Sequence, residues 1–154
     1  MSFIKSIIQG NGEISLSKFS GKFGTASETD LFSGQAKNIC FLDVETTGKN
    51  RQDDGIVEVA VKSVSINEQS GEILSINNQY ESFNDPGIPI SEEASAVNGI
   101  TDEMISGKHI DWDIVMEIFS STELVVSHNA SFDRAFLDRA LPESKKKIMG
   151  MFDK

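Results

Sequence analysis

Two carboxylates at the end of an apolar run are the residues whose spacing first suggests chemistry. Residues 39–48 read Ile-Cys-Phe-Leu-Asp-Val-Glu-Thr-Thr-Gly and place acids at Asp43 and Glu45. Such a run predicts a strand buried on both faces, from which side chains two residues apart leave on the same side. The two carboxylates are then roughly 6.5 Å apart along the strand. Acids paired in this way can hold divalent cations for phosphoryl transfer.

A third acid, Asp133, follows a second apolar run. Residues 124–127 predict a short buried strand, too apolar for an exposed edge, and Ser131 can cap the helix that comes next. On that helix Asp133 shares a face with Phe136 and Leu137. Two interpretations stay open. Asp133 complements the positive end of the helix dipole, or it is a metal ligand that faces inward.

The strands that must position these acids are visible as alternating patterns. Residues 56–66 and 72–83 alternate apolar and polar side chains, and residues 67–71 are typical of a turn. Two strands joined by so short a turn form an antiparallel hairpin. Together with the strand that carries Asp43 and Glu45, they predict a three-stranded meander.

Helices are expected after the meander. Pro86 and Pro89 end the last strand, Ser91 is typical of a helix cap, and the Asn-Gly pair at 98–99 ends a short helix. A second capped helical turn is expected at 101–103. Residues 111–120 predict a longer helix whose core-facing stripe consists of Trp112, Val115, Met116 and Phe119. A meander followed by helix, strand and helix predicts a mixed α/β sheet.

Length and composition fit one domain with its own core. The chain has 154 residues, 38% hydrophobic and 25% charged, with a formal net charge of −10. This charge argues against a broad basic surface for nucleic acid, although bound cations would reverse the local field around carboxylates. No apolar run is long enough for a membrane span, and no signal peptide is recognised. The single cysteine, Cys40, favours the cytoplasm.

The N-terminal part differs in composition. Residues 1–37 are rich in glycine and serine and predict a loosely ordered extension or linker, whereas residues 38–154 form the predicted domain. Within the extension, residues 1–8 predict an amphipathic turn of helix, and the alternation over 14–17 predicts a minor strand.

Three segments carry a family resemblance. Residues 41–48 (FLDVETTG), residues 86–101 with Pro-Gly-Ile-Pro-Ile and Asn-Gly-Ile-Thr, and residues 125–137 with His-Asn-Ala-Ser-Phe-Asp occur in a fixed order. Together they resemble the DEDD-type, DnaQ-like 3′–5′ exonucleases, which include the epsilon proofreading subunit of DNA polymerase III. The resemblance implies a ribonuclease H-like fold and metal-dependent hydrolysis of phosphodiesters from the 3′ end of DNA or RNA.

The resemblance also implies roles for particular residues. Asp43, Glu45 and Asp133 correspond to three of four metal-binding catalytic acids of a two-metal site, and hard oxygen ligands suit Mg²⁺ or Mn²⁺. The residues that would bind or shape the site for a single-stranded 3′ end are Thr46, Thr47, Gly48, Asn98, Gly99, Ile100, His128, Asn129 and Phe132.

The sequence departs from the family pattern in two places. Asn98 stands where the family often has a histidine, and no histidine follows His128, so the third family motif is absent. This implies that the C-terminal part of the fold is missing, which leaves an apolar face for a polymerase or another protein to cover. Three functions stay open: an exonuclease, a catalytically inactive nucleic-acid-binding or polymerase-associated module, and a structural remnant.

Overall fold

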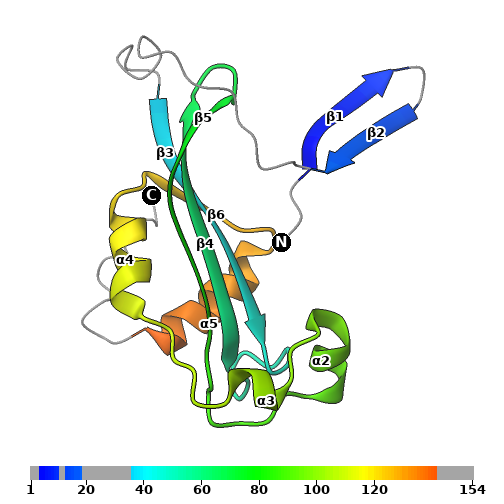
Figure 1. Cartoon of the computed structure of the whole chain (residues 1–154), viewed down its shortest axis with the longest axis vertical. Helices are drawn as coiled ribbons and strands as arrows, with labels where there is room; N and C mark the ends of the chain where they lie inside the picture. The colour runs from blue at the N-terminus through cyan, green and yellow to red at the C-terminus, as the bar shows by residue number, and fades with distance from the viewer. Residues whose placement is uncertain (1–3, 11–12, 19–35, 142–154) are drawn as a thin grey trace.

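The computed structural model describes residues 4–10, 13–18 and 36–141 (Figure 1). The first two segments form strands β1 (Ile4–Gly10) and β2 (Glu13–Lys18), which pair antiparallel in a separate two-stranded sheet. The helical turn predicted for residues 1–8 is therefore wrong from residue 4 onward, because backbone pairing with β2 replaces helical hydrogen bonds there. The minor strand predicted over 14–17 is confirmed. Residues 19–35 of the predicted linker and the C-terminal residues 142–154 lie outside the described residues.

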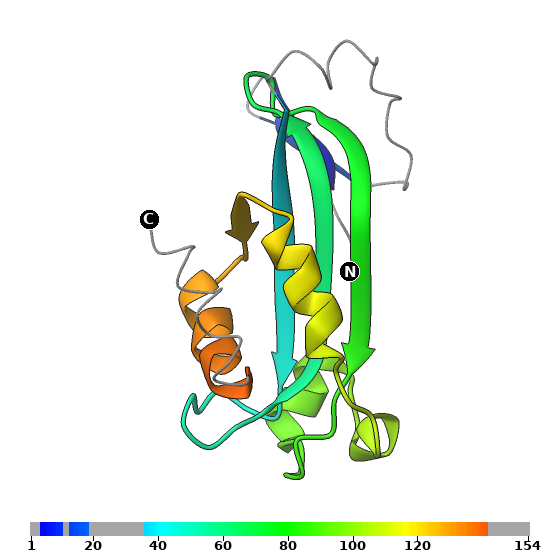
Figure 2. The same ribbon diagram turned by 90° about the vertical axis from the view of Figure 1, so that its left-hand side faces the viewer.

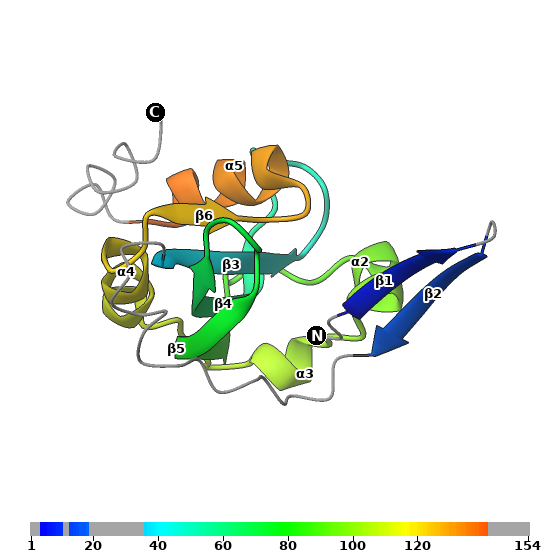
Figure 3. The ribbon, with the colours of Figure 1, turned by 90° about the horizontal axis from the view of Figure 1, so that it is seen from above.

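The main sheet confirms the predicted meander. Strands β3 (Ala36–Thr46), β4 (Ile56–Asn67) and β5 (Ile73–Phe83) pair antiparallel in sequence order. Strand β6 (Leu124–Val126) joins the other side of β3 in parallel, which gives the order β5-β4-β3-β6 (Figure 3). The sheet is therefore mixed, and the strand that carries the acid pair lies inside it.

The main core lies on one face of this sheet. Cys40, Leu42 and Val44 of β3 are buried against α4 (Trp112–Ser120) and α5 (Ala130–Ala140). Figure 2 shows α4 crossing in front of β3 and β4, with α5 beside it. The prediction that β3 is buried on both faces is wrong for its acid end. Asp43 and Glu45 stay partly exposed because both helices pack on the opposite face.

Helix α4 forms as its pattern predicts. Asp111 caps it, accepting hydrogen bonds from the amides of Asp113 and Ile114. The apolar stripe faces the core, with Phe119 fully buried. Full burial of a side chain of this size contributes about 3 kcal/mol. The helix is thus held by its cap at one end and by its packed face along its length.

Two short helices lie beyond the acid end of β3. Helix α2 (Glu92–Asn98) begins at the Ser91 cap, whose Oγ accepts from the Ala94 amide at 3.1 Å, and it ends at Gly99, whose φ is 75°. Helix α3 (Asp102–Ile105) follows as expected. The Ser91 amide donates to the Thr47 carbonyl at 2.9 Å. This bond joins the start of α2 to the end of β3.

Two local expectations near the second acid motif are wrong. Leu124 is 55% exposed, because β6 is an edge of the described sheet and pairs there with β3 alone. Helix α5 begins at Ala130 with Asn129 at the cap position, so Ser131 lies in its first turn and does not cap it. Among the described residues, no helix combines the length and apolar character that a membrane crossing needs.

Candidate active site

The acid pair stands at the end of β3. Asp43 and Glu45 leave the same face of the strand, opposite Ala60 and Glu58 of β4. The register shifts between Glu45 and Thr46, which ends regular pairing directly after the second acid. The predicted arrangement of two carboxylates at a strand end is therefore present.

Asp133 is built into the interface between α5 and β3. Its side chain is 4% exposed, its Oδ1 accepts from the Val44 amide at 3.2 Å, and its Oδ2 accepts from Ser127 Oγ at 2.5 Å. Val44 lies between Asp43 and Glu45 in the sequence, so this bond brings the third acid to the backbone of the acid pair. Asp133 thus faces inward, and it also lies in the first turn of α5, so its position fits both interpretations.

The acids influence one another electrostatically. Burial raises the pKa of Asp43, and the negative charge of Asp133 raises it further, while His128 acts in the opposite direction. Burial also raises the pKa of Glu45, with a further contribution from Asp43, and a hydrogen bond from Asn98 partly offsets both. The three predicted acids therefore form one electrostatic group.

Glu58 extends this group across the sheet. It lies directly opposite Glu45, and its pKa is raised by burial, then by Glu81 and by Glu45. Like charges placed opposite each other on neighbouring strands are destabilising. Sequence patterns did not single out Glu58, although its position in the alternation of β4 places it on the acid face.

The loop after the acids is organised by Asp54. Its Oδ1 accepts from Thr47 Oγ1 at 2.9 Å, and its Oδ2 accepts from the Asn50 amide at 2.7 Å. The same carboxylate lies against Gly48, where an added Cβ would come within 2.4 Å of Asp54 Oδ2. Thr47 Oγ1 also accepts from the Gly55 amide at 3.1 Å. Residues 46–55 thus form a hydrogen-bonded loop that begins one residue after Glu45.

A cleft opens between the acid end of β3 and helix α2. Its volume is about 240 Å³, and Glu45 lies in its wall. Four of the predicted substrate residues line it, namely Thr46, Gly48, Asn98 and Phe132. Lys49 and Val97, which is 83% exposed, line it as well and were not predicted. The cleft combines apolar surface with one lysine and two acids, Glu45 and Glu93.

The other predicted substrate residues lie elsewhere. Thr47 and Ile100 are buried, at 0% and 3% exposure, so their side chains serve the loop and a small core around α3. Gly99 forms the turn that ends α2. His128 and Asn129 are exposed where β6 leads into α5. The predicted residues therefore divide between the cleft, the loop and core that support it, and the exposed connection from β6 to α5.

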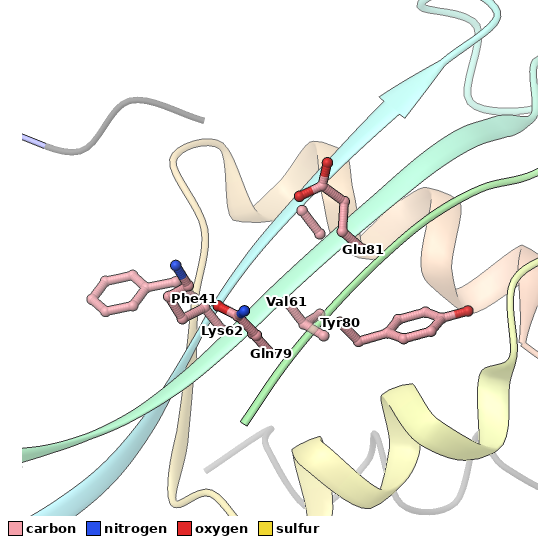
Figure 4. A pocket seen from close by; sticks show the side chains of 7 residues that line it. Phe41, Val61, Lys62, Gln79, Tyr80 and Glu81 are labelled. Carbon is pink, nitrogen blue, oxygen red and sulfur yellow. The ribbon is translucent and has the colours of Figure 1, made fainter. Parts of the chain in front are cut away.

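A second pocket lies on the sheet itself, as Figure 4 shows. Its volume is about 210 Å³, and its lining includes Phe41, Lys62 and Glu81. Phe41 and Tyr80 point to opposite sides of the strands in this view. None of the three predicted acids lines this pocket, whereas Glu45 lines the cleft beside α2.

The donor chemistry of the acids suits a hard divalent cation. Asp43 and Glu45 offer carboxylate oxygens on one face. A cation bound there would relieve the repulsion among Asp43, Glu45 and Asp133, which adds to the effect of burial on the pKa values of Asp43 and Glu45. In the described part of the chain, however, no three side chains of His, Cys, Asp or Glu gather as a group that could hold a metal ion. Asp133 accepts hydrogen bonds on both oxygens instead.

Comparisons with known proteins identify a family for this chain. A family model described as exonuclease matches residues 40–153. DNA polymerase III PolC-type of Listeria welshimeri is 38% identical over 109 residues, which are 69% of this chain and 7% of that protein. The PolC-type polymerase of Thermotoga maritima is 34% identical over 112 residues, which are 71% of this chain and 7% of that protein. The chain thus spans a small fraction of the length of these relatives.

Solved structures show the same fold. Exonuclease I of E. coli in complex with a dT13 oligonucleotide aligns with a TM-score of 0.52 at 16% identity, over 65% of this chain and 22% of that chain. Exonuclease I of Methylocaldum szegediense aligns with a TM-score of 0.51 at 20% identity, over the same shares of the two chains. At these identities the likeness shows the fold alone, the expected ribonuclease H-like mixed sheet.

Proposed function

This chain belongs to the exonuclease family, and we propose that it hydrolyses phosphodiester bonds at the 3′ end of a single-stranded nucleic acid. The observation that carries the proposal is the acid group at the end of β3. Asp43 and Glu45 share a face, and Asp133 is hydrogen-bonded to the backbone amide between them. Paired carboxylates of this kind can hold the divalent cations that phosphoryl transfer uses.

In this proposal Asp43, Glu45 and Asp133 hold Mg²⁺ or Mn²⁺. When bound, such cations supply a nucleophilic hydroxide at neutral pH and stabilise the negative charge that develops on the phosphate. Asp133 also fixes α5 against β3 through the Val44 amide, so the protein sets the spacing of its acids. Asn98 orients Glu45 by a hydrogen bond, the same bond that partly offsets the rise in the pKa of Glu45.

The cleft beside Glu45 would receive the terminal nucleotide. Phe132 is partly exposed there and is braced by Phe136, with ring centroids 4.8 Å apart. An aromatic ring held in this way can stack on a base of any sequence. Lys49 lies in the same cleft and would attract the phosphate backbone. His128 and Asn129 would shape the rim.

We further propose the cytoplasm as the compartment and a polymerase as a partner. The single cysteine of the sequence is buried and free in β3, as expected in a reducing environment. The PolC-type relatives are polymerases, and this chain spans only 7% of their length. Association with a polymerase would bring a 3′ end to the cleft.

A second function, a nucleic-acid-binding module without catalysis, is favoured by one observation. Both carboxylate oxygens of Asp133 accept hydrogen bonds from the protein, and they must also turn toward a cation for catalysis. If replacing these hydrogen bonds by a bound cation costs too much free energy, the cleft binds a nucleic-acid strand and does not cleave it.

Oligonucleotide degradation separates these functions. Single-stranded DNA and RNA labelled at the 5′ end would be incubated with Mn²⁺ and wild type, Asp43→Asn, Glu45→Gln or Asp133→Asn. Asp138→Asn is the matched control, because Asp138 is an exposed acid on α5 that pairs with Arg134 at 3.5 Å. We expect a ladder of products shortened from the 3′ end for wild type and the control alone. Binding without shortening would favour the second function. The absence of both binding and shortening would indicate a structural remnant.

A further inference from the structure

Arg139 lies at the opposite end of α5 from Asp133 and contacts the loop that follows the acid pair. Its guanidinium donates hydrogen bonds to the backbone carbonyls of Arg51 and Asp54. Figure 2 shows this loop passing beneath the C-terminal end of α5. Arg139 also lies over the Phe136 ring, 5.8 Å from its centroid, which fixes the direction of its side chain.

The loop transmits this contact to the strand that carries the acids. Asp54, whose carbonyl Arg139 binds, holds Thr47 and Asn50 through its carboxylate. Thr47 is also paired through its amide with the Gly55 carbonyl at 2.9 Å. These bonds end two residues from Glu45. The helix with the third acid is therefore tied to β3 at two points, directly by Asp133 and through the loop by Arg139.

We propose that Arg139 is a positioning residue of the acid site, which sets the end of β3 relative to α5 by clamping the loop at residues 51 and 54. This inference rests on the proposed nuclease function and adds a residue outside the cleft to it. A planar guanidinium spreads its donors over two nitrogen atoms and suits the two carbonyls, whereas the three donors of a lysine ammonium share one nitrogen atom. Arg139 acts through the loop and touches neither the acids nor the cleft.

The test compares Arg139→Ala and Arg139→Lys with Arg134→Ala. Arg134 is the matched control because it is also exposed on α5 and pairs with Asp138 within that helix. Amide hydrogen exchange reports on the clamp without any need for catalysis. We expect Arg139→Ala to speed exchange at Asn50 and Gly55 by about tenfold or more, the effect of losing a charge-assisted hydrogen bond. Amides of the β3–β4 ladder should keep wild-type rates.

Kinetics then separate positioning from general stability. We expect Arg139→Ala to lower kcat about ten- to a hundredfold with KM changed less than about threefold, because misplaced catalytic groups lose transition-state contacts while the cleft keeps its shape. Arg139→Lys should show smaller changes than Arg139→Ala, both in amide exchange and in kcat. If Arg139→Ala does not fold, Arg139→Lys carries the test through the same two readouts.

Wild-type exchange at Asn50 and Gly55 in the Arg139 variants would overturn the inference. So would a kcat no lower than that of Arg134→Ala. If the wild-type protein shows no cleavage, the proposed function fails, and the exchange measurement still decides whether Arg139 clamps the loop.

Discussion

Replacing Asp43 by asparagine should stabilise the cation-free protein at pH 7, although it removes an acid from the centre of the site. Burial and the charge of Asp133 raise the pKa of Asp43, so its ionised form is less favourable in the folded protein than in the unfolded chain. Asparagine has nearly the same shape and carries no charge. The free energy of unfolding of Asp43→Asn should therefore exceed that of wild type.

The charge of Asp43 also raises the pKa of Glu45, so part of the effect can be sized from the spacing of this acid pair. Two unit charges about 6.5 Å apart repel by about 0.6 kcal/mol in water and about 2.5 kcal/mol at an effective dielectric constant of 20. Asp43 and Glu45 are both partly exposed, so solvent screening favours a value near 1 kcal/mol. In a chain of this length, that corresponds to a rise in Tm of about 2–4 °C.

The stability difference between Asp43→Asn and wild type should depend on pH in a definite direction. A carboxyl group whose pKa is raised on folding contributes stability below its unfolded pKa, about 3.9 for aspartate. That contribution is lost as the pH rises through the folded pKa. The advantage of Asp43→Asn should therefore be full at pH 7, shrink as the pH falls through the raised pKa, and vanish below about pH 3.9.

Thermal unfolding in the presence of a chelator measures this difference. Glu117→Gln is the control, because it removes the same charge from an exposed position on α4. A Tm for Asp43→Asn at pH 7 no higher than that of the control would refute the reasoning. Adding Mn²⁺ should reverse the order, since a cation bound to the folded state stabilises wild type more than the variant.

Three further outcomes concern the core and the loop. Phe119→Ala should lower the free energy of unfolding by about 3–5 kcal/mol, whereas Ile114→Ala on the exposed side of the same helix should stay within about 0.5 kcal/mol, by chemical denaturation. Thr47→Val should cost about 1–3 kcal/mol in the same assay, because it removes the donor to Asp54 Oδ1 and the acceptor of the Gly55 amide, and Thr47→Ser should cost less. Gly48→Ala should speed amide exchange at Asn50, because an added Cβ displaces Asp54; unchanged exchange there would contradict the close approach.

Patterns with a short period predicted the elements that pack against the core. The alternation in β4 and β5 and the helical stripe of α4 each report a side chain's immediate surroundings, and those elements formed where expected. Phe3, Ile4, Ile7 and Ile8 have a helical spacing, but so short a segment carries little information about the period. Because residues 4–10 pair with β2, they form a strand.

Contacts between residues far apart in the sequence limited how much of the candidate site could be predicted. The types and spacing of Asp43 and Glu45 were sufficient to place them on one face, since strand geometry is local. The engagement of Asp133 by Val44 and Ser127, and the clamp by Arg139, depend on how α5 packs. No pattern along the chain encodes that docking. The exposure of β6 likewise depends on the order of strands across the sheet.

The hydrogen bond from Val44 to Asp133 spans 89 positions of the chain. During synthesis, the strand with the first two acids leaves the ribosome well before the helix that supplies the third. The strands of the meander can pair early, because the turns between them are short. The acid group can form only after the long segment between Val44 and Asp133 has closed. A ribosome stalled before residue 133 should therefore carry a folded hairpin that cannot degrade nucleic acid. Under the proposed function, such timing would protect nearby RNA from the nascent chain.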